Sequence, residues 1–368
     1  MYGAILGDMI GSVYEFHNVR TKAFPLFTAE SGITDDSIMT VAVASALLKH
    51  KREGLPFGAA VVQEMQSFGR RYPAPKGGYG ARFSRWLRER DPKPYGSYGN
   101  GAAMRVSPCG IAAGSLDEAL SLAESSAAVT HDHPEGVKGA KATAAAVYLA
   151  RTGADKPAIR RYIEESYYPL NESVEEIRRY YGFDESCQGT VPQAIECFLE
   201  SEDFEDAIRN AVSIGGDSDT VGAITGGIAW AYYGKNGLTD GMRALRTQAE
   251  ARLPGDLLEV VRAFADAEQG GIRFLFLKDR NKRHCETGCV GRQGISRISR
   301  FIRTTKNGRL VCESSVLCRA PAKPAEARRA TAPQMIFFCC FSSKKKRRGR
   351  SRSVFCSIRA RCGTMIPL

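Results

Sequence analysis

Gly215-Gly216-Asp217-Ser218-Asp219-Thr220 is the stretch that decides the predicted fold. Its two glycines permit backbone conformations that other residues avoid, and the carboxylates and hydroxyl that follow stand where an apolar helical run begins. An upstream stretch, Thr34-Asp35-Asp36, has the same chemistry and also precedes a helical run. Carboxylate and hydroxyl oxygens are the ligands that hard divalent cations prefer. We expect the intervening chain to bring the two clusters together.

Either cluster alone is also typical of an ordinary helix start, because Asp and Thr cap free backbone N–H groups and favour the helix dipole. Two clusters in one chain weaken that alternative. Asp35, Asp36, Asp217 and Asp219 would repel one another if crowded together, and two divalent cations would balance their four charges.

Charge and cysteine divide the chain near residue 272. Residues 273–368 carry 24 Lys and Arg against 4 Asp and Glu, whereas residues 1–272 carry 28 against 36. Eight of the 11 cysteines also fall in the last 96 residues. We therefore predict an acidic domain at 1–272 and a basic, Cys-rich tail at 273–368 that is disordered or an aberrant extension.

The first domain has helical periodicity almost throughout and scarcely any strand-like alternation, so we predict an all-α, compact many-helix bundle. Gly3, Gly7 and Gly11 recur at every fourth residue of the first helix, which favours close packing against another helix. The run from 35 to 50 is predicted to be amphipathic, with Thr34 as its N-cap. The helices are expected at 2–13, 35–50, 56–68, 83–90, 116–128, 135–151, 157–165, 174–181, 191–199, 204–212, 218–233, 238–252 and 254–267.

A glycine-rich loop, Tyr95-Gly96-Ser97-Tyr98-Gly99-Asn100-Gly101-Ala102-Ala103-Met104-Arg105, separates two of these helices. Such a loop exposes backbone N–H groups that suit an anionic phosphate. It lacks the Lys-Ser or Lys-Thr of a P-loop, and Met104 replaces the third glycine of a dinucleotide fingerprint. The loop by itself is equally consistent with a turn and with a ligand site.

Five short segments in this order resemble the ADP-ribosylglycohydrolase family, over about residues 1 to 268. The matching segments are Gly7-Asp8-Met9-Ile10-Gly11 with Glu15, Thr34-Asp35-Asp36, Ser97 to Arg105, Thr130-His131 with Glu135-Gly136, and Gly216 to Thr220. The resemblance implies an all-α fold with a binuclear Mg²⁺ site, in which Mn²⁺ is an alternative metal. It also implies a metal-dependent hydrolase that releases ADP-ribose from an ADP-ribosylated protein or a small-molecule ADP-ribose conjugate.

The resemblance carries roles onto individual positions. It implies that the loop from Ser97 to Asn100 holds the diphosphate, that Tyr98 stacks near the adenosine and that His131 contacts ADP-ribose. Glu15 would move a proton while a water held by the metals attacks the anomeric carbon. The implied metal ligands are Thr34, Asp35, Asp36, Asp217, Asp219 and Thr220. The implied catalytic residues are Glu15, Asp35 and Asp217, and the substrate-binding residues are Ser97, Tyr98, Gly99, Asn100, Gly101, Met104 and His131.

Several points stay open at this stage. Arginine-linked ADP-ribose is the first expectation for the substrate, while serine-linked protein, O-acetyl-ADP-ribose and a modified base remain alternatives, as does a non-catalytic ADP-ribose binder. The variable segment 72–95 is expected to line the acceptor pocket. Three scattered cysteines and no secretory or membrane-spanning run in residues 1–272 predict a cytoplasmic protein. Nucleic-acid binding would rest on the basic tail alone.

Overall fold

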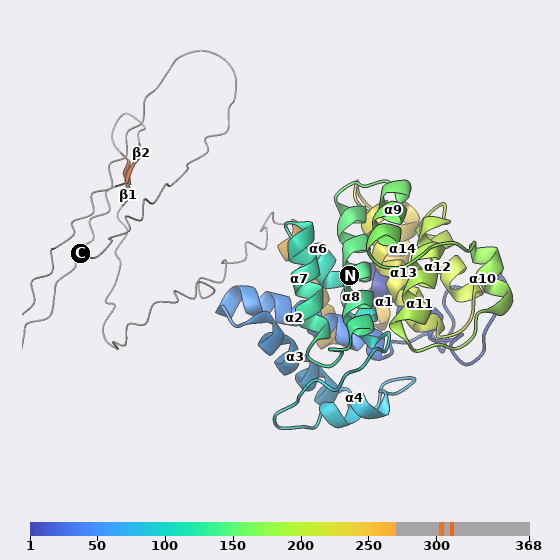
Figure 1. Ribbon diagram of the computed structural model, residues 1–368, viewed down its shortest axis with the longest axis horizontal. Helices are drawn as coiled ribbons and strands as arrows, with labels where there is room; N and C mark the ends of the chain where they lie inside the picture. The colour runs from blue at the N-terminus through green and yellow to red at the C-terminus, as the bar shows by residue number, and fades with distance from the viewer. Residues whose placement is uncertain (270–301, 305–309, 313–368) are drawn as a thin grey trace, which may run out of the picture. The chain divides into compact units, whose positions relative to one another are not determined.

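The computed structural model describes residues 1–269, 302–304 and 310–312, and the first of these ranges is helical (Figure 1). The all-α prediction is confirmed for the range 1–269. Its helices are α1 (Tyr2–Gly11), α2 (Asp35–Glu53), α3 (Phe57–Arg71), α4 (Ala81–Trp86), α5 (Gly101–Met104), α6 (Ser107–Ala112), α7 (Leu116–Ala127), α8 (Pro134–Arg151), α9 (Lys156–Ser166), α10 (Val174–Tyr180), α11 (Cys187–Leu199), α12 (Phe204–Ser213), α13 (Ser218–Tyr233), α14 (Asp240–Arg252) and α15 (Gly255–Gln269).

Helices α1 and α13 pack together through small residues. A Cβ atom placed on Gly7 would lie only 1.8 Å from the carbonyl oxygen of Gly222, and one on Gly3 would lie 2.0 Å from that of Gly226. At the other end of α1, a Cβ on Gly11 would lie 2.2 Å from the oxygen of Ser218. The predicted close packing of the glycine face is confirmed. The two helices run antiparallel, so the end of α1 meets the start of α13.

Helix α13 is enclosed by other helices along most of its length. It packs against α1, α8, α11 and α12, and its residues from Ser218 to Ala229 are buried. Figure 1 shows it among these helices near the middle of the fold. Because neighbouring helices surround α13, its first turn is fixed in position at one end of the bundle.

Helix α2 differs from the expected amphipathic pattern. Thr34 is its N-cap, as predicted, and accepts the N–H of Asp36. Every residue from Asp36 to Ala44 is buried, however, so the first half of the helix has no exposed face. The physical reason is that α2 is surrounded by α1, α3, α6 and α15. Its exposed residues, Lys51, Arg52 and Glu53, stand at its C-terminus.

Two short helices were not predicted: α5 lies within the glycine-rich stretch, and α6 follows it. α5 has a single turn, and α6 begins with Pro108 in its first turn. Elements this short leave little periodicity in the sequence, although proline is favoured in the first turn of a helix. They orient the loop that reaches the site.

Two strands outside the helical range, β1 (Ile302–Thr304) and β2 (Leu310–Cys312), pair antiparallel with Ile302 opposite Cys312. This pair was not expected from the sequence. The prediction of a disordered or aberrant tail otherwise concerns residues outside those that the structure describes. The boundary at 272 stays a prediction.

Replacing Gly7 with alanine tests the contact between α1 and α13. The new Cβ would overlap the Gly222 carbonyl, which is backbone and cannot rotate away, so the helices must separate. We expect the free energy of unfolding to fall by about 3 kcal/mol or more in urea denaturation. Gly255→Ala is the control, because a Cβ there meets no atom within 4 Å. Equal stability of the two variants would contradict this account of the packing.

Candidate active site

The two acidic clusters come together in the folded chain. Thr220 Oγ1 donates a hydrogen bond to Asp36 Oδ2 at 3.2 Å, joining the start of α13 to the start of α2. Carboxylates of both clusters line a cleft of about 520 Å³. The predicted site residues that line it are Glu15, Asp35, Asp36, Ser97, Gly99, Asn100, Gly101, Met104, His131, Asp217, Asp219 and Thr220.

Thr34 lies beneath the cleft and does not line it. Its hydroxyl donates to Asp8 Oδ1 at 2.8 Å and accepts the N–H of Asp36 at 3.1 Å. Asp8 Oδ2 accepts the backbone N–H groups of Thr34 and Ser37 at 3.1 and 3.0 Å. Asp8 therefore holds the first turn of α2 against α1. Sequence reasoning gave Asp8 no role, although a carboxylate in an apolar helix was a usable signal.

The glycine-rich loop is tied to the acidic cluster by Asn100. Its Nδ2 donates to Asp217 Oδ2 at 2.7 Å and to Thr190 Oγ1 at 3.1 Å. Tyr98 points elsewhere: it does not line the cleft, its side chain is half-exposed, and its ring centroid lies 5.3 Å from that of His133. The predicted stacking of Tyr98 on adenosine stays a prediction.

Glu15 follows α1 and reaches the cluster because its segment is fastened to the turn before α13. Asn18 Nδ2 donates to the Gly216 oxygen at 3.0 Å, and Asn18 Oδ1 accepts the Gly216 N–H at 2.8 Å. Arg20 donates to the carbonyl oxygens of Ile214 and Tyr181. These contacts hold the segment in place. Ligand oxygens of Glu15, Asp217 and Asp219 all lie within 4.8 Å of one another.

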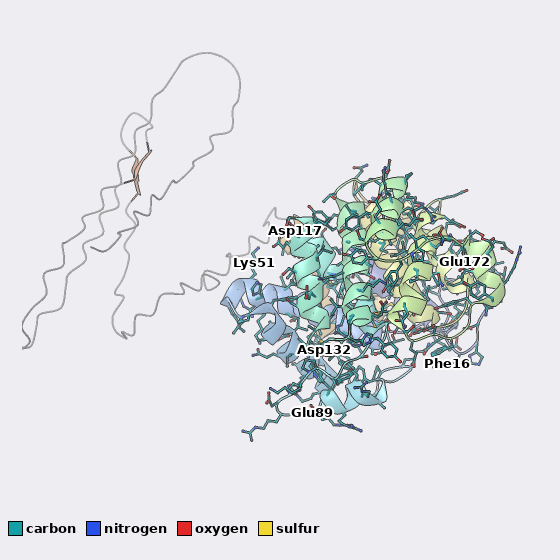
Figure 2. All side chains as sticks on the ribbon, in the orientation of Figure 1. Phe16, Lys51, Glu89, Asp117, Asp132 and Glu172 are labelled. Carbon is teal, nitrogen blue, oxygen red and sulfur yellow. The ribbon has the colours of Figure 1, made fainter. Side chains whose placement is uncertain are left out.

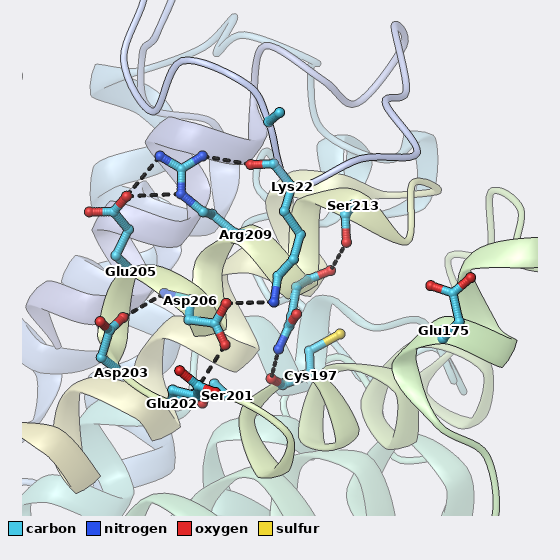
Figure 3. A network of polar contacts seen from close by, with 12 residues as sticks. Lys22, Glu175, Cys197, Ser201, Glu202, Asp203, Glu205, Asp206, Arg209 and Ser213 are labelled. Atoms are coloured by element: carbon cyan, nitrogen blue, oxygen red, sulfur yellow. Dashed lines mark hydrogen bonds and ion pairs between the residues drawn. The ribbon is translucent and has the colours of Figure 1, made fainter.

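Further along, α12 anchors the same segment (Figure 3). Lys22 Nζ pairs with Asp206 at 2.5 Å, and Arg209 donates to the carbonyl oxygens of Lys22 and Phe24 at 2.7 and 2.9 Å. By contrast, the Phe16 side chain is two-thirds exposed at the surface (Figure 2). The segment therefore has one face bound to the bundle and one face open to solvent.

Residues 77–80 line the cleft, and the preceding Lys76 is held by two hydrogen bonds. Lys76 Nζ donates to Ser12 Oγ at 3.1 Å and to the Glu30 oxygen at 2.9 Å. Gly77 has a φ of 75°, and a Cβ there would lie 3.1 Å from Glu15 Oε2. The expected lining segment 72–95 contributes residues 77–83 and Tyr95 to the cleft.

Comparison with known proteins identifies the family. The sequence model of the ADP-ribosylglycohydrolase family matches residues 1–271. This chain belongs to the ADP-ribosylglycohydrolase family. The predicted resemblance is confirmed, and so is the enzyme class, a hydrolase of glycosidic bonds, because the similar proteins are named ADP-ribosylhydrolases.

Three proteins illustrate the likeness of this ADP-ribosylglycohydrolase to others. ADP-ribosylhydrolase ARH3 of Mus musculus is 29% identical over 309 residues, covering 63% of this chain and 82% of that protein. ADP-ribosylarginine hydrolase Tri1 of Pseudomonas putida is 28% identical over 268 residues, covering 65% and 70%. A solved structure titled "ADP-ribosylglycohydrolase-related protein complex" matches with a TM-score of 0.51 and 26% identity, covering 71% of this chain and 96% of that one.

The carboxylates of this ADP-ribosylglycohydrolase site are under electrostatic strain. Burial, followed by the charge of Asp219, raises the pKa of Asp35, Asp36 and Asp217 well above the ordinary range. The same two causes raise the pKa of Glu15 to about 7. The strain arises because like charges are gathered where water cannot screen them.

Some of these oxygens also lack a partner. Among the described residues, the buried oxygens Glu15 Oε2, Asp36 Oδ1 and Asp219 Oδ1 accept no hydrogen bond. A divalent cation would satisfy such oxygens and neutralise the repulsion, so the donor set fits a hard metal ion. Metal-ligand roles for the individual predicted residues stay predictions.

The length of the helices and the burial of the cysteines in the described residues 1–269 bear on membrane insertion and on thiol reactivity. Within residues 1–269, no helix is long and apolar enough to cross a membrane. The cysteines of this range, Cys109, Cys187 and Cys197, are free and buried. Burial raises the pKa of each thiol, so none is an activated nucleophile.

Stability should depend jointly on pH and on divalent cations. Without cations, the pKa of folded Glu15, about 7, exceeds its ordinary value of 4.5, so the folded state binds more protons between these values. The free energy of unfolding therefore falls as the pH rises through that window. Because a cation offsets the repulsion, we expect Mg²⁺ or Mn²⁺ to raise the melting temperature more near about pH 8 than near about pH 5.5.

Differential scanning fluorimetry with EDTA or with added metal would measure this. Asp117→Asn, which removes an exposed carboxylate on α7, is the control and should keep the full pH-dependent difference. A cation-induced shift that is equal at both pH values would contradict the interpretation.

Proposed function

We propose that this protein hydrolyses the glycosidic bond between ADP-ribose and an acceptor and so reverses ADP-ribosylation. The acceptor that we propose is an arginine residue of a protein. Residues 1–272 would carry out the catalysis. The acidic cluster would bind divalent cations, Mg²⁺ or Mn²⁺. The proposal keeps the cytoplasmic location predicted from the sequence. The observation that carries it is the convergence of Glu15 with both acidic clusters beside a glycine-rich loop, all in one cleft.

Different residues of the chain would bind different parts of the site's contents, the cations and the substrate. The carboxylates of Asp35, Asp36, Asp217 and Asp219, with Thr220, would hold the cations. Bound there, two cations would supply Lewis acidity toward vicinal ribose hydroxyls and a water molecule. Asn100 donates to Asp217 and so fixes the distance between this cluster and the loop proposed for the diphosphate.

Glu15 is the residue proposed to move a proton. Burial and the charge of Asp219 raise its pKa to about 7 in the cation-free site, and a carboxyl group placed beside the acidic cluster suits a general acid or base. The contacts of Asn18 and Arg20 hold the segment, and Gly77 leaves room for the carboxylate. Developing positive charge on the ribose would be favoured by the surrounding carboxylates.

The choice of an arginine-linked acceptor has two supports. One similar protein, Tri1, is named an ADP-ribosylarginine hydrolase. In addition, Glu185 lines the cleft together with Glu15, and two carboxylates would complement a cationic guanidinium group. Other linkages remain outcomes of the test.

Release of ADP-ribose is the decisive measurement. We expect the full chain to release ADP-ribose from arginine-ADP-ribosylated protein with Mg²⁺ or Mn²⁺ and to lose activity in EDTA. Asp217→Asn should abolish turnover, whereas Asp117→Asn, at an exposed position of α7 (Figure 2), should retain it. Activity that survives both the chelator and Asp217→Asn would contradict the metal assignment.

A negative result would still be informative. If the arginine-linked substrate is not cleaved while serine-linked or O-acetyl-ADP-ribose is, the acceptor assignment is wrong. If ADP-ribose binds but no substrate is cleaved, the protein is a binding module of the same family.

Glu15→Gln separates proton transfer from binding. The amide has similar size but cannot exchange a proton, so kcat should fall by about 100-fold or more. ADP-ribose affinity, measured by calorimetry, should change little. Glu30→Gln, on the same segment but outside the cleft, is the control and should keep normal kcat. Full turnover by the Glu15 variant would rule out this role.

A further inference from the structure

A buried chain of polar contacts leads from Arg105 to His131. Arg105 is 1% exposed, and its Nη1 donates to the Gly101 oxygen at 2.7 Å. Its Nη2 donates to the Ser126 oxygen and to Thr130 Oγ1, each at 2.9 Å. Thr130 Oγ1 in turn lies 2.7 Å from His131 Nδ1. A guanidinium group can only donate, so the direction of the chain is fixed at its first link.

The direction of the hydrogen bond between Thr130 and His131 depends on the single hydroxyl hydrogen of Thr130. Since Oγ1 already accepts from Arg105, its hydrogen can go to His131 Nδ1 at 2.7 Å or to the Ala127 oxygen at 3.5 Å. The shorter contact has the length expected for a good hydrogen bond, and the longer one does not. If the ring donated instead, the buried hydroxyl hydrogen would have only the 3.5 Å contact, so the geometry favours Thr130 as the donor to Nδ1. In the neutral imidazole the ring hydrogen must then be on Nε2.

The Nε2 atom faces the glycine-rich loop. A Cβ placed on Gly99 or on Gly101 would lie 3.5 Å from it, and His131 lines the cleft. Among residues 1–269, Nε2 makes none of the hydrogen bonds found for this ring, which involve Nδ1. The absence of side chains at Gly99 and Gly101 thus leaves the N–H open toward the loop.

The charges near the ring favour the neutral form. Burial, followed by the positive charges of Arg105 and Arg82, lowers the pKa of His131 well below its ordinary value. The ring is thus a fixed donor and not a titrating group at neutral pH.

We infer that Thr130 is a positioning residue that, with Arg105, holds His131 as the neutral tautomer with hydrogen on Nε2. The ring then donates to a phosphate oxygen of ADP-ribose beside Gly99 and Gly101. The second statement rests on the proposed function, because it requires ADP-ribose to occupy this cleft. The first concerns the ring alone.

The tautomer can be read directly by NMR. In full-length protein labelled with ¹⁵N-histidine, long-range ¹H–¹⁵N spectra distinguish a protonated from an unprotonated ring nitrogen. The chain has 5 histidines, and His131→Gln identifies the signals of His131. We expect Nε2 to be protonated and Nδ1 not. Protonation of Nδ1 in the wild-type protein would overturn the inference.

Thr130→Val tests the link through the hydroxyl. It should give a mixture of tautomers and weaken ADP-ribose binding about tenfold by calorimetry, as expected for the loss of one well-oriented hydrogen bond. Thr130→Ser keeps a hydroxyl and should restore both properties. Thr143→Val is the matched control, because Thr143 is equally buried and its hydroxyl has no partner among the described residues.

The outcomes separate the two proposals. If Thr130→Val leaves the tautomer and the affinity unchanged, Thr130 has no positioning role. If the wild-type protein does not bind ADP-ribose, the proposed function and the phosphate contact both fail, and the spectra still decide whether Thr130 and Arg105 fix the ring.

Discussion

The close approach of α1 and α13 sets the geometry on which the site depends. The two helices face each other through glycines, with Gly7 against Gly222 at the centre of the contact. Because they run antiparallel, the C-terminal end of α1 arrives beside Asp217 and Asp219. Glu15 follows α1 by only a few residues, so the acidic cluster is completed by helix packing. A larger residue in the contact would push apart the elements that carry these groups.

Without a cation, the clustered carboxylates destabilise the folded state. Buried groups of like charge raise one another's pKa, and the oxygens of Glu15, Asp36 and Asp219 that lack hydrogen bonds add to the cost. The surrounding fold tolerates this because the first half of α2 and most of α13 are buried. Strain that is confined to one cleft and relieved by a ligand is typical of a functional site.

Much of the fold was accessible to prediction because local patterns indicate it. The helices, the cap at Thr34 and the close packing of Gly3, Gly7 and Gly11 depend on neighbouring residues or on a short repeat. The burial of α2 on all sides was missed, since it depends on helices that lie far away in the sequence. Short α5 and α6 were missed because one or two turns show no clear period.

For the site, the sequence by itself determined the chemistry: two sets of carboxylates with a hydroxyl, a glycine-rich loop and a histidine after threonine. These residue types are legible without coordinates because their ligand preferences are intrinsic. Only the tertiary structure decided which groups meet. It placed Thr34 beneath the cleft with Asp8, held the Glu15 segment through Asn18, and joined Arg105 to Thr130. Such contacts join residues distant in sequence, so they depend on how the helices pack, which no local pattern specifies.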